Sequence, residues 1–173
     1  MSKEERFSEE SLRRIAAQKV SYRYSVRIHL AVYLLVNIIL FAINFLTVFP
    51  IITFQTSWFL YPLLGWLIGL SIHIASYIMF ATGVYPRAKR GVIYHFTAYI
   101  TVMILLIVNN LQIIPQYLWV LWPGILWGAG LVGHVIIYLI YFKSKMTETG
   151  DVTSRKEQAI EREMEKMRKK MNG

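Results

Sequence analysis

The chain of 173 residues contains no cysteine, and it carries no charge over two long stretches. Without cysteine it has no disulfide framework, no thiolate metal site, no cysteine nucleophile and no covalently attached c-type haem. No Asp, Glu, Lys or Arg occurs between Ile28 and Pro86, or between Gly91 and Phe142. One bilayer crossing takes about 20 apolar residues, so each uncharged stretch is long enough to cross the membrane, turn and cross back. The sequence therefore predicts an integral membrane protein.

The same lack of charge bears on function. Neither uncharged stretch holds a carboxylate, lysine or arginine that could carry acid–base chemistry or an ion relay. The chain also has no phosphate-binding glycine loop and no Ser-His-Asp order. Its net charge of +9 comes from basic residues beside the apolar stretches, where they act as topology signals and contacts for anionic lipid. We therefore expect a protein that is not an enzyme and binds no nucleic acid.

Turn signals divide each uncharged stretch into two crossings. Pro50 interrupts the first stretch and Pro115 the second. Basic residues gather at both termini and in the middle loop, which predicts a multi-pass protein of the cell membrane with both termini cytoplasmic. The expected organisation is an N-terminal cytoplasmic amphipathic helix at 1–26, a first transmembrane hairpin at 27–80, a basic cytoplasmic loop at 81–91, a second transmembrane hairpin at 92–142 and a charged cytoplasmic tail helix at 143–173.

The two stretches are similar in sequence to each other. Residues 29–44 align with 95–110, and 58–77 align with 119–138, each without a gap. The weightiest matches pair His29 with His95, Tyr33 with Tyr99, Asn44 with Asn110, Trp58 with Trp119, Pro62 with Pro123, Trp66 with Trp127, Gly69 with Gly130 and His73 with His134. Each copy holds two crossings, so both enter the membrane from the same side, as parallel repeats do. We therefore expect an all-α integral membrane four-helix bundle made of two repeated transmembrane hairpins.

The order of these residues resembles a known family. The pattern is His-x3-Tyr-x3-Asn, a turn, and then Trp, Pro-x3-Trp-x2-Gly-Leu-x2-His, carried here by His29, Tyr33, Asn37, Trp58, Pro62, Trp66, Gly69, Leu70 and His73. It resembles the two-transmembrane (2TM) domain family of prokaryotic membrane proteins, over about residues 10–80 and more weakly over 85–145. The second copy has Met103 where the first has Asn37. In that family the domain occurs alone or fused to sensor histidine kinases and other signalling modules, so the resemblance implies a topology more than an activity.

Each crossing contains one of the four histidines. His29 and His73 are equally far from the first turn, and His95 and His134 are equally far from the second. Antiparallel helices place such residues at the same depth, so we expect the four rings in one layer facing the bundle interior near the cytoplasmic edge. Uncharged surroundings keep an imidazole neutral and able to bind metal.

Three interpretations of this histidine layer stay open. Two histidines could bind haem b, either His29 with His95 or His73 with His134. All four could hold Zn or Cu, if the rings converge closely. Alternatively, they form a hydrogen-bonded packing layer with Tyr33, Tyr99, Tyr77 and Tyr138. The expected cofactor site comprises His29, His73, His95, His134, Tyr33, Tyr99, Trp66 and Trp127, and its four histidines are the expected metal ligands.

Two further patterns concern packing and the tail. Gly65 with Gly69, and Gly124 with Gly128, form GxxxG pairs that allow close helix approach. In the tail, Ser154 and Glu157 fit a capping box. The stripe of Ile160, Met164, Met167 and Met171 that follows predicts a helix lying on the membrane surface, or a short coiled coil between protomers.

We therefore expect a non-enzymatic membrane protein that uses the histidine layer, with haem b or a metal ion, for electron transfer or sensing. The alternative is a structural or signalling module whose histidines serve packing. In either case the expected partners are the lipid bilayer, anionic lipid at the basic loops, and a second copy or another membrane protein.

Overall fold

A computed structural model describes residues 9–82, 87–143, 145–146 and 152–171. Its helices are α1 (Glu9–Val48), α2 (Leu60–Ala81), α3 (Arg87–Ile113), α4 (Leu121–Ile137), which a π-helical turn η1 (Tyr138–Phe142) extends, and α5 (Arg155–Met171). Two antiparallel two-residue strands, β1 (Lys145–Met146) and β2 (Val152–Thr153), precede α5. Parts of the predicted N-terminal helix and basic loop, residues 1–8 and 83–86, lie outside the described residues. The helical fold class is confirmed.

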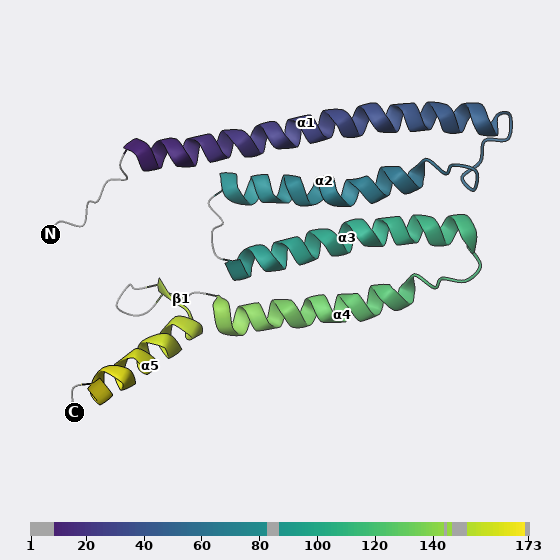
Figure 1. Cartoon of the computed structure of the whole chain (residues 1–173). Coiled ribbons are helices and arrows are strands. Elements are labelled where there is room, and N and C mark those ends of the chain that lie inside the picture. Colours follow the sequence, from purple (N-terminus) through teal and green to yellow (C-terminus); the bar gives the residue numbers. More distant parts are fainter. Residues whose placement is uncertain (1–8, 83–86, 144, 147–151, 172–173) are drawn as a thin grey trace.

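Four helices are long and apolar enough to cross a membrane. These spans are Arg13–Val48, Leu60–Ala81, Arg87–Ile113 and Leu121–Phe142. They form two hairpins, α1–α2 and α3–α4, and Figure 1 shows the four helices running side by side along one axis. The protein is therefore a multi-pass membrane protein built from two helical hairpins, as the sequence predicts.

The first helix runs well beyond one crossing. Its 40 residues extend for about 60 Å at 1.5 Å per residue, against a hydrocarbon core of about 30 Å. No glycine or proline occurs between Glu9 and Val48, so nothing in this part of the chain breaks the helix. The amphipathic segment and the first crossing, which the sequence suggested as separate elements, are one continuous helix over the described residues.

The four spanning helices lie in a row in chain order. Contacts join α1 to α2, α2 to α3 and α3 to α4, and the contact between α2 and α3 is the most extensive of these. Among the described residues, no comparable contact joins α1 to α4, and these two helices form the outer edges of the row (Figure 1). The two helices of each hairpin therefore contact each other, and the two hairpins meet through α2 and α3.

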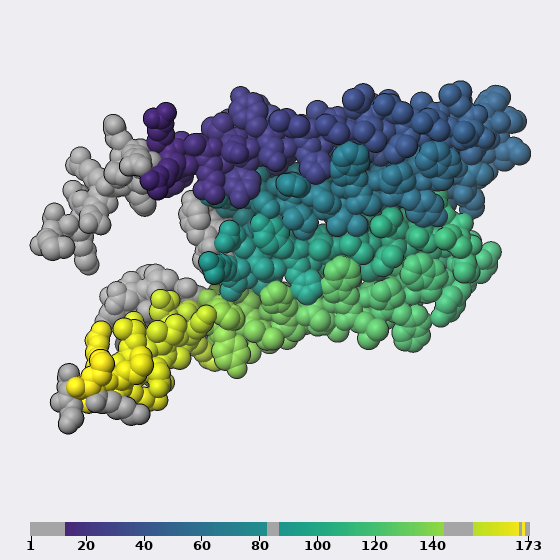
Figure 2. All heavy atoms as spheres, in the orientation of Figure 1, coloured from purple at the N-terminus to yellow at the C-terminus, as the bar shows by residue number. Residues whose placement is uncertain are grey.

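Along the row, several asparagines are buried and several leucines are exposed, which is the reverse of the pattern in a water-soluble protein. Asn44 is 3% exposed and Asn110 is fully buried, whereas Leu35 and Leu46 on α1 are 60% and 76% exposed. Figure 2 shows the four helices as one elongated body with α5 at one end. An apolar outer surface suits a hydrocarbon surrounding, in which polar side chains must find partners inside the protein.

The tail helix begins at the cap that the sequence predicts. The backbone N–H of Glu157 donates to Oγ of Ser154 at 3.2 Å. The ammonium of Lys156 lies 5.5 Å from the centre of the Phe142 ring, which attaches the start of α5 to the end of the last span. The stripe of Ile160, Met164 and Met167 is exposed.

Candidate functional site: paired histidine clusters

The first hairpin contains a cluster of four aromatic side chains. His29 and Tyr33 lie one turn apart on α1, and Trp66 and His73 lie two turns apart on the facing side of α2. The indole Nε1 of Trp66 donates to Nε2 of His29 at 2.5 Å, and the rings of His29 and His73 lie 4.8 Å apart between centroids. Tyr33 packs edge-on against Trp66 at 86°, and its hydroxyl donates to the carbonyl of Leu63 at 3.2 Å.

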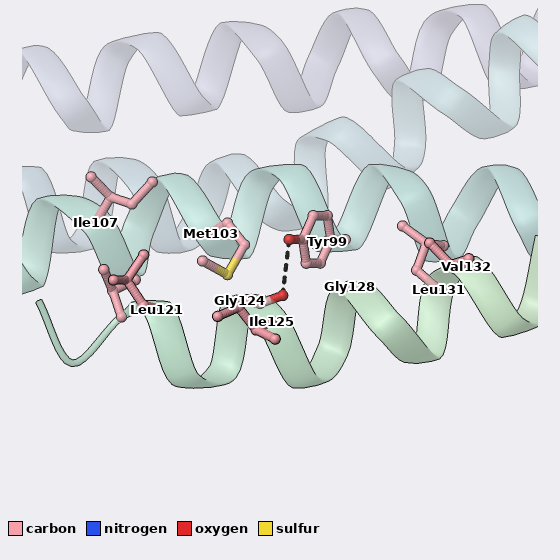
Figure 3. A pocket seen from close by; sticks show the side chains of 10 residues that line it. Tyr99, Met103, Ile107, Leu121, Gly124, Ile125, Gly128, Leu131 and Val132 are labelled. Carbon is pink, nitrogen blue, oxygen red and sulfur yellow. Dashed lines mark hydrogen bonds between the residues drawn. The ribbon is translucent and has the colours of Figure 1, made fainter.

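The second hairpin builds the same cluster from the matched residues. Nε1 of Trp127 donates to Nε2 of His95 at 2.7 Å, and the rings of His95 and His134 lie 5.2 Å apart. Tyr99 again packs edge-on against the indole at 86°. Its hydroxyl donates to the carbonyl of Gly124 at 3.0 Å, the bond drawn in Figure 3. Gly124 occupies the position of Leu63, so even the backbone acceptor is equivalent in the two copies.

The indole bond assigns the proton on His95. An indole N–H only donates, so Nε2 of His95 accepts and carries no proton in the neutral ring. The proton of the neutral imidazole then lies on Nδ1, which is 2.9 Å from Nδ1 of His134 and donates to it. His134, as the acceptor, carries its own proton on Nε2. Hydrogen bonds thus run in one direction from Trp127 through His95 to His134.

A second matched pair of residues ties each turn to its hairpin. Oδ1 of Asn44 accepts from the backbone N–H of Phe59 at 3.0 Å, and its Nδ2 donates to the carbonyl of Thr56 at 3.3 Å. Asn110 makes the equivalent bonds to Val120 and Tyr117, at 3.0 and 2.9 Å. The sequence marks these asparagines only as identities between the copies. Their position just before each turn is the signal that could have assigned their role.

The bonds between the two hairpins use residues that do not match. Oγ of Ser76 on α2 lies 2.9 Å from the hydroxyl of Tyr94 on α3, where one donates to the other. Near the turns, Nε2 of Gln112 donates to the carbonyls of Phe54 and Ser57, at 2.6 and 3.1 Å. The position of Tyr94 is Ile28 in the first copy, and that of Gln112 is Leu46. Polar residues that match between the copies form the bonds within each hairpin, and unmatched polar residues form the bonds between the two hairpins.

The structure pairs the histidines differently from the haem prediction. Ring contacts join His29 to His73 and His95 to His134, each within one hairpin, rather than joining residues of different hairpins. The physical reason is the row arrangement, in which α2 lies between α1 and α3, and α3 lies between α2 and α4. Over the residues that the structure describes, no group of three or more His, Cys, Asp or Glu side chains could hold a metal ion. Over the described residues the four rings thus form two pairs, one in each hairpin.

The partners of the histidines also differ from those expected. The packing interpretation assigned hydrogen bonds between histidines and tyrosines, but Tyr33 and Tyr99 donate to backbone carbonyls. The tryptophans, expected as part of the cofactor site, donate to His29 and His95. For Tyr77 and Tyr138, also expected in the layer, the structure gives a half-buried position and no bond to a histidine among the described residues.

The two glycine pairs have different surroundings. A Cβ atom on Gly124 would lie 2.9 Å from Cε of Met103, and one on Gly128 would lie 3.1 Å from the hydroxyl of Tyr99. The second pair therefore allows α3 side chains to approach α4 closely, as predicted. Around Gly65 and Gly69 no atom lies within 4 Å of such a Cβ, so this pair supports no close approach within the described chain.

Comparison with known proteins gives one family. A family model described as 2TM domain matches residues 14–83 and again residues 86–165. The two matches abut within the loop between α2 and α3, so each contains one hairpin. Neither the curated proteins nor the solved structures include a match to the chain.

Proposed function

The chain belongs to the 2TM domain family as a tandem duplication, and from this we propose that it is a non-enzymatic structural or signalling module of the membrane. In this proposal the two hairpins form a stable anchor, and the anchor positions the charged helix α5 and the basic N-terminal part of α1 beside the membrane surface. The histidines contribute hydrogen bonds that fix the register of each hairpin.

The observation that carries the proposal is the recurrence of the indole–imidazole bond in both copies. Trp66 donates to His29, and Trp127 donates to His95, through the same pair of atoms. These bonds engage Nε2 of both α1 and α3 histidines, and Nδ1 of His95 is engaged as well. Such intramembrane bonds stabilise by only about 1 kcal/mol each, but they can specify which helix faces pair.

Binding of haem b, Zn or Cu stays a prediction that competes with this proposal. Iron or zinc at His29 or His95 through Nε2 would require the indole bond to break, because that nitrogen has a single lone pair. His73 is exposed, and Nε2 of His134 carries a proton in the directed chain described above. A cofactor held through Nε2 of His29 or His95 would therefore rearrange the clusters that the described residues form.

A spectroscopic and thermodynamic experiment separates the two functions. The detergent-purified protein is expected to show no Soret band in oxidised or reduced form and no stoichiometric metal by elemental analysis. Trp127→Phe and His95→Phe are each expected to lower the free energy of unfolding, and the double variant is expected to cost about 1 kcal/mol less than their sum. A Soret band that disappears in His95→Ala would contradict the proposal and support haem binding.

The proposal includes the orientation that the basic residues predict, with both termini and the loop between the hairpins cytoplasmic. Because the chain has no cysteine, single cysteines can report this directly. Tyr117→Cys at the second turn is expected to react with a membrane-impermeant maleimide in intact cells, and Glu161→Cys on α5 only after lysis. The opposite labelling pattern would reverse the orientation.

A further inference from the structure

A long apolar groove lies between α3 and α4. Its volume is about 550 Å³, and its walls include Met103 and Ile107 from α3 and Leu121, Gly124 and Gly128 from α4. Figure 3 shows Met103 from α3 and Leu121 from α4 in the space between the two helices. The groove does not include any histidine, and Tyr99 is the one residue of the second cluster that lines it.

Comparison of the copies shows why the groove exists in the second hairpin. Where α4 has Gly124 and Gly128, α2 has Leu63 and Leu67. Two glycines in place of two leucines give the groove a floor with no side chains of its own, and Cε of Met103 and the hydroxyl of Tyr99 from α3 lie close above it.

The side chains at the turn end of the groove are also smaller than those of the first hairpin. Ile107 and Val120 occupy the positions of Phe41 and Phe59, whose rings pack against each other at 5.2 Å and 80° in the first hairpin. The second copy has thus lost two aromatic rings as well as two leucine side chains from the equivalent space. The space left by these smaller side chains is an open groove, in which an apolar occupant can take the place of the missing packing.

The chemistry of the walls determines what can fill the groove. The lining is almost wholly apolar, and its polar groups are used internally, because the Tyr99 hydroxyl donates to the carbonyl of Gly124. No charged side chain lines it. The occupant must therefore be a hydrocarbon that needs no hydrogen bond from the protein.

The position and length of the groove further limit which hydrocarbon can occupy it. It extends along α4 from Val120 to Val132, about 18 Å at 1.5 Å per residue. One leaflet of the hydrocarbon core is about 15 Å thick. Val120 lies at the turn between α3 and α4, so the groove starts where headgroups begin and ends near mid-membrane. Ile125 and Val132 at its edge are 63% and 58% exposed, so the groove opens sideways to the surrounding lipid.

We propose that this groove binds one acyl chain of a phospholipid from the leaflet at the turn side of the membrane. The chain lies parallel to α3 and α4, with its headgroup level with the second turn. The first hairpin is expected to bind no such chain at the equivalent place, where it has the larger residues Phe41, Phe59, Leu63 and Leu67.

The test fills the groove with the residues of the first copy. Ile107→Phe with Val120→Phe recreates the Phe41–Phe59 pair, and Ile104→Phe with Leu126→Phe adds the same rings at exposed positions outside the groove. Each protein is reconstituted with phosphatidylcholine that carries a nitroxide in mid-chain, and electron paramagnetic resonance counts the motionally restricted chains. The wild type and the exposed-ring variant are expected to hold one more restricted chain per protomer than the filled variant.

A second variant keeps the test valid if the first one misfolds. Gly124→Leu fills the floor, where Cε of Met103 is the flexible end of a side chain that can move aside. It is expected to lose the same restricted chain while circular dichroism retains the wild-type helix content. Equal numbers of restricted chains in the wild type and both filled variants would overturn the proposal. A dimer in the wild type that dissociates in the filled variants would also overturn it, because a second copy would then be the occupant.

Discussion

The two hairpins have the same polar bonds but different apolar packing. Both contain the indole–imidazole bond, the tyrosine bond to a matched carbonyl and the asparagine that ties the turn. Their apolar packing differs, since Phe41 packs against Phe59 in the first hairpin and glycines line a groove in the second. In hydrocarbon, water cannot replace a lost hydrogen bond, whereas lipid can replace a lost apolar side chain. This difference explains why the polar bonds match and the apolar packing does not.

The largest effect is expected at the asparagines that tie the turns. Asn110 is fully buried and makes three hydrogen bonds, to Ile114, Tyr117 and Val120, so Asn110→Leu should lower the free energy of unfolding by about 3 kcal/mol. Asn44 makes two such bonds to its turn, and Asn44→Leu should cost about 2 kcal/mol. Denaturant titration in detergent micelles measures both. A larger loss at Asn44 than at Asn110 would contradict this ranking of the two turns by their number of hydrogen bonds.

A smaller and equal effect is expected at the indoles. Trp66→Phe and Trp127→Phe each remove one bond to a histidine and retain most of the ring, so each should cost about 1 kcal/mol. The same titration applies, and Trp58→Phe serves as a control because Trp58 lies near the turn outside both clusters. Losses that differ by more than the cost of one such bond would show that the two clusters are not equivalent.

The smallest change in stability is expected at the bond between the hairpins. Gln112→Leu introduces the residue that the first copy has at position 46 and removes the bonds to Phe54 and Ser57. It also removes Oε1 of Gln112, which is buried without a partner among the described residues, so the two effects offset and the net cost should stay below about 1 kcal/mol.

The readout for Gln112→Leu is geometry rather than stability. Spin labels on the two turns, at Thr53→Cys and Tyr117→Cys, should give a broader distance distribution in the variant than in the otherwise native chain. An unchanged distribution would mean that Ser76 and Tyr94, or apolar packing alone, hold the hairpins together.

The sequence is sufficient to predict the spans and the turns, because the lack of charge and the prolines mark them directly. It also predicts the duplication, because the matched residues of the two stretches occur in the same order. It further predicts that His29 and His73 lie at the same depth, since residues equally far from the turn of an antiparallel hairpin lie side by side. The order of the helices in a row is not predictable in this way. A lipid-exposed helix carries apolar residues on every side, so periodicity does not tell which side meets which neighbour.

The choice of partners inside the site is the other part that the sequence leaves open. Tyr33 and Trp66 both lie near His29, and either could donate to it. The structure assigns the indole to the histidine and the phenol to the backbone of α2, which depends on side-chain reach rather than on spacing. Ser76 and Tyr94 were missed because neither has a counterpart in the other copy that would mark it.

The state of the imidazole nitrogens tests the central account most directly, because it reports whether histidine serves hydrogen bonding or ligation. Nitrogen-15 spectra of the protein labelled at histidine and tryptophan should show unprotonated Nε2 in His29 and in His95, each coupled to an indole N–H. The couplings should disappear one at a time in Trp66→Phe and Trp127→Phe. A protonated or metal-bound Nε2 in either ring of the wild type would contradict the account.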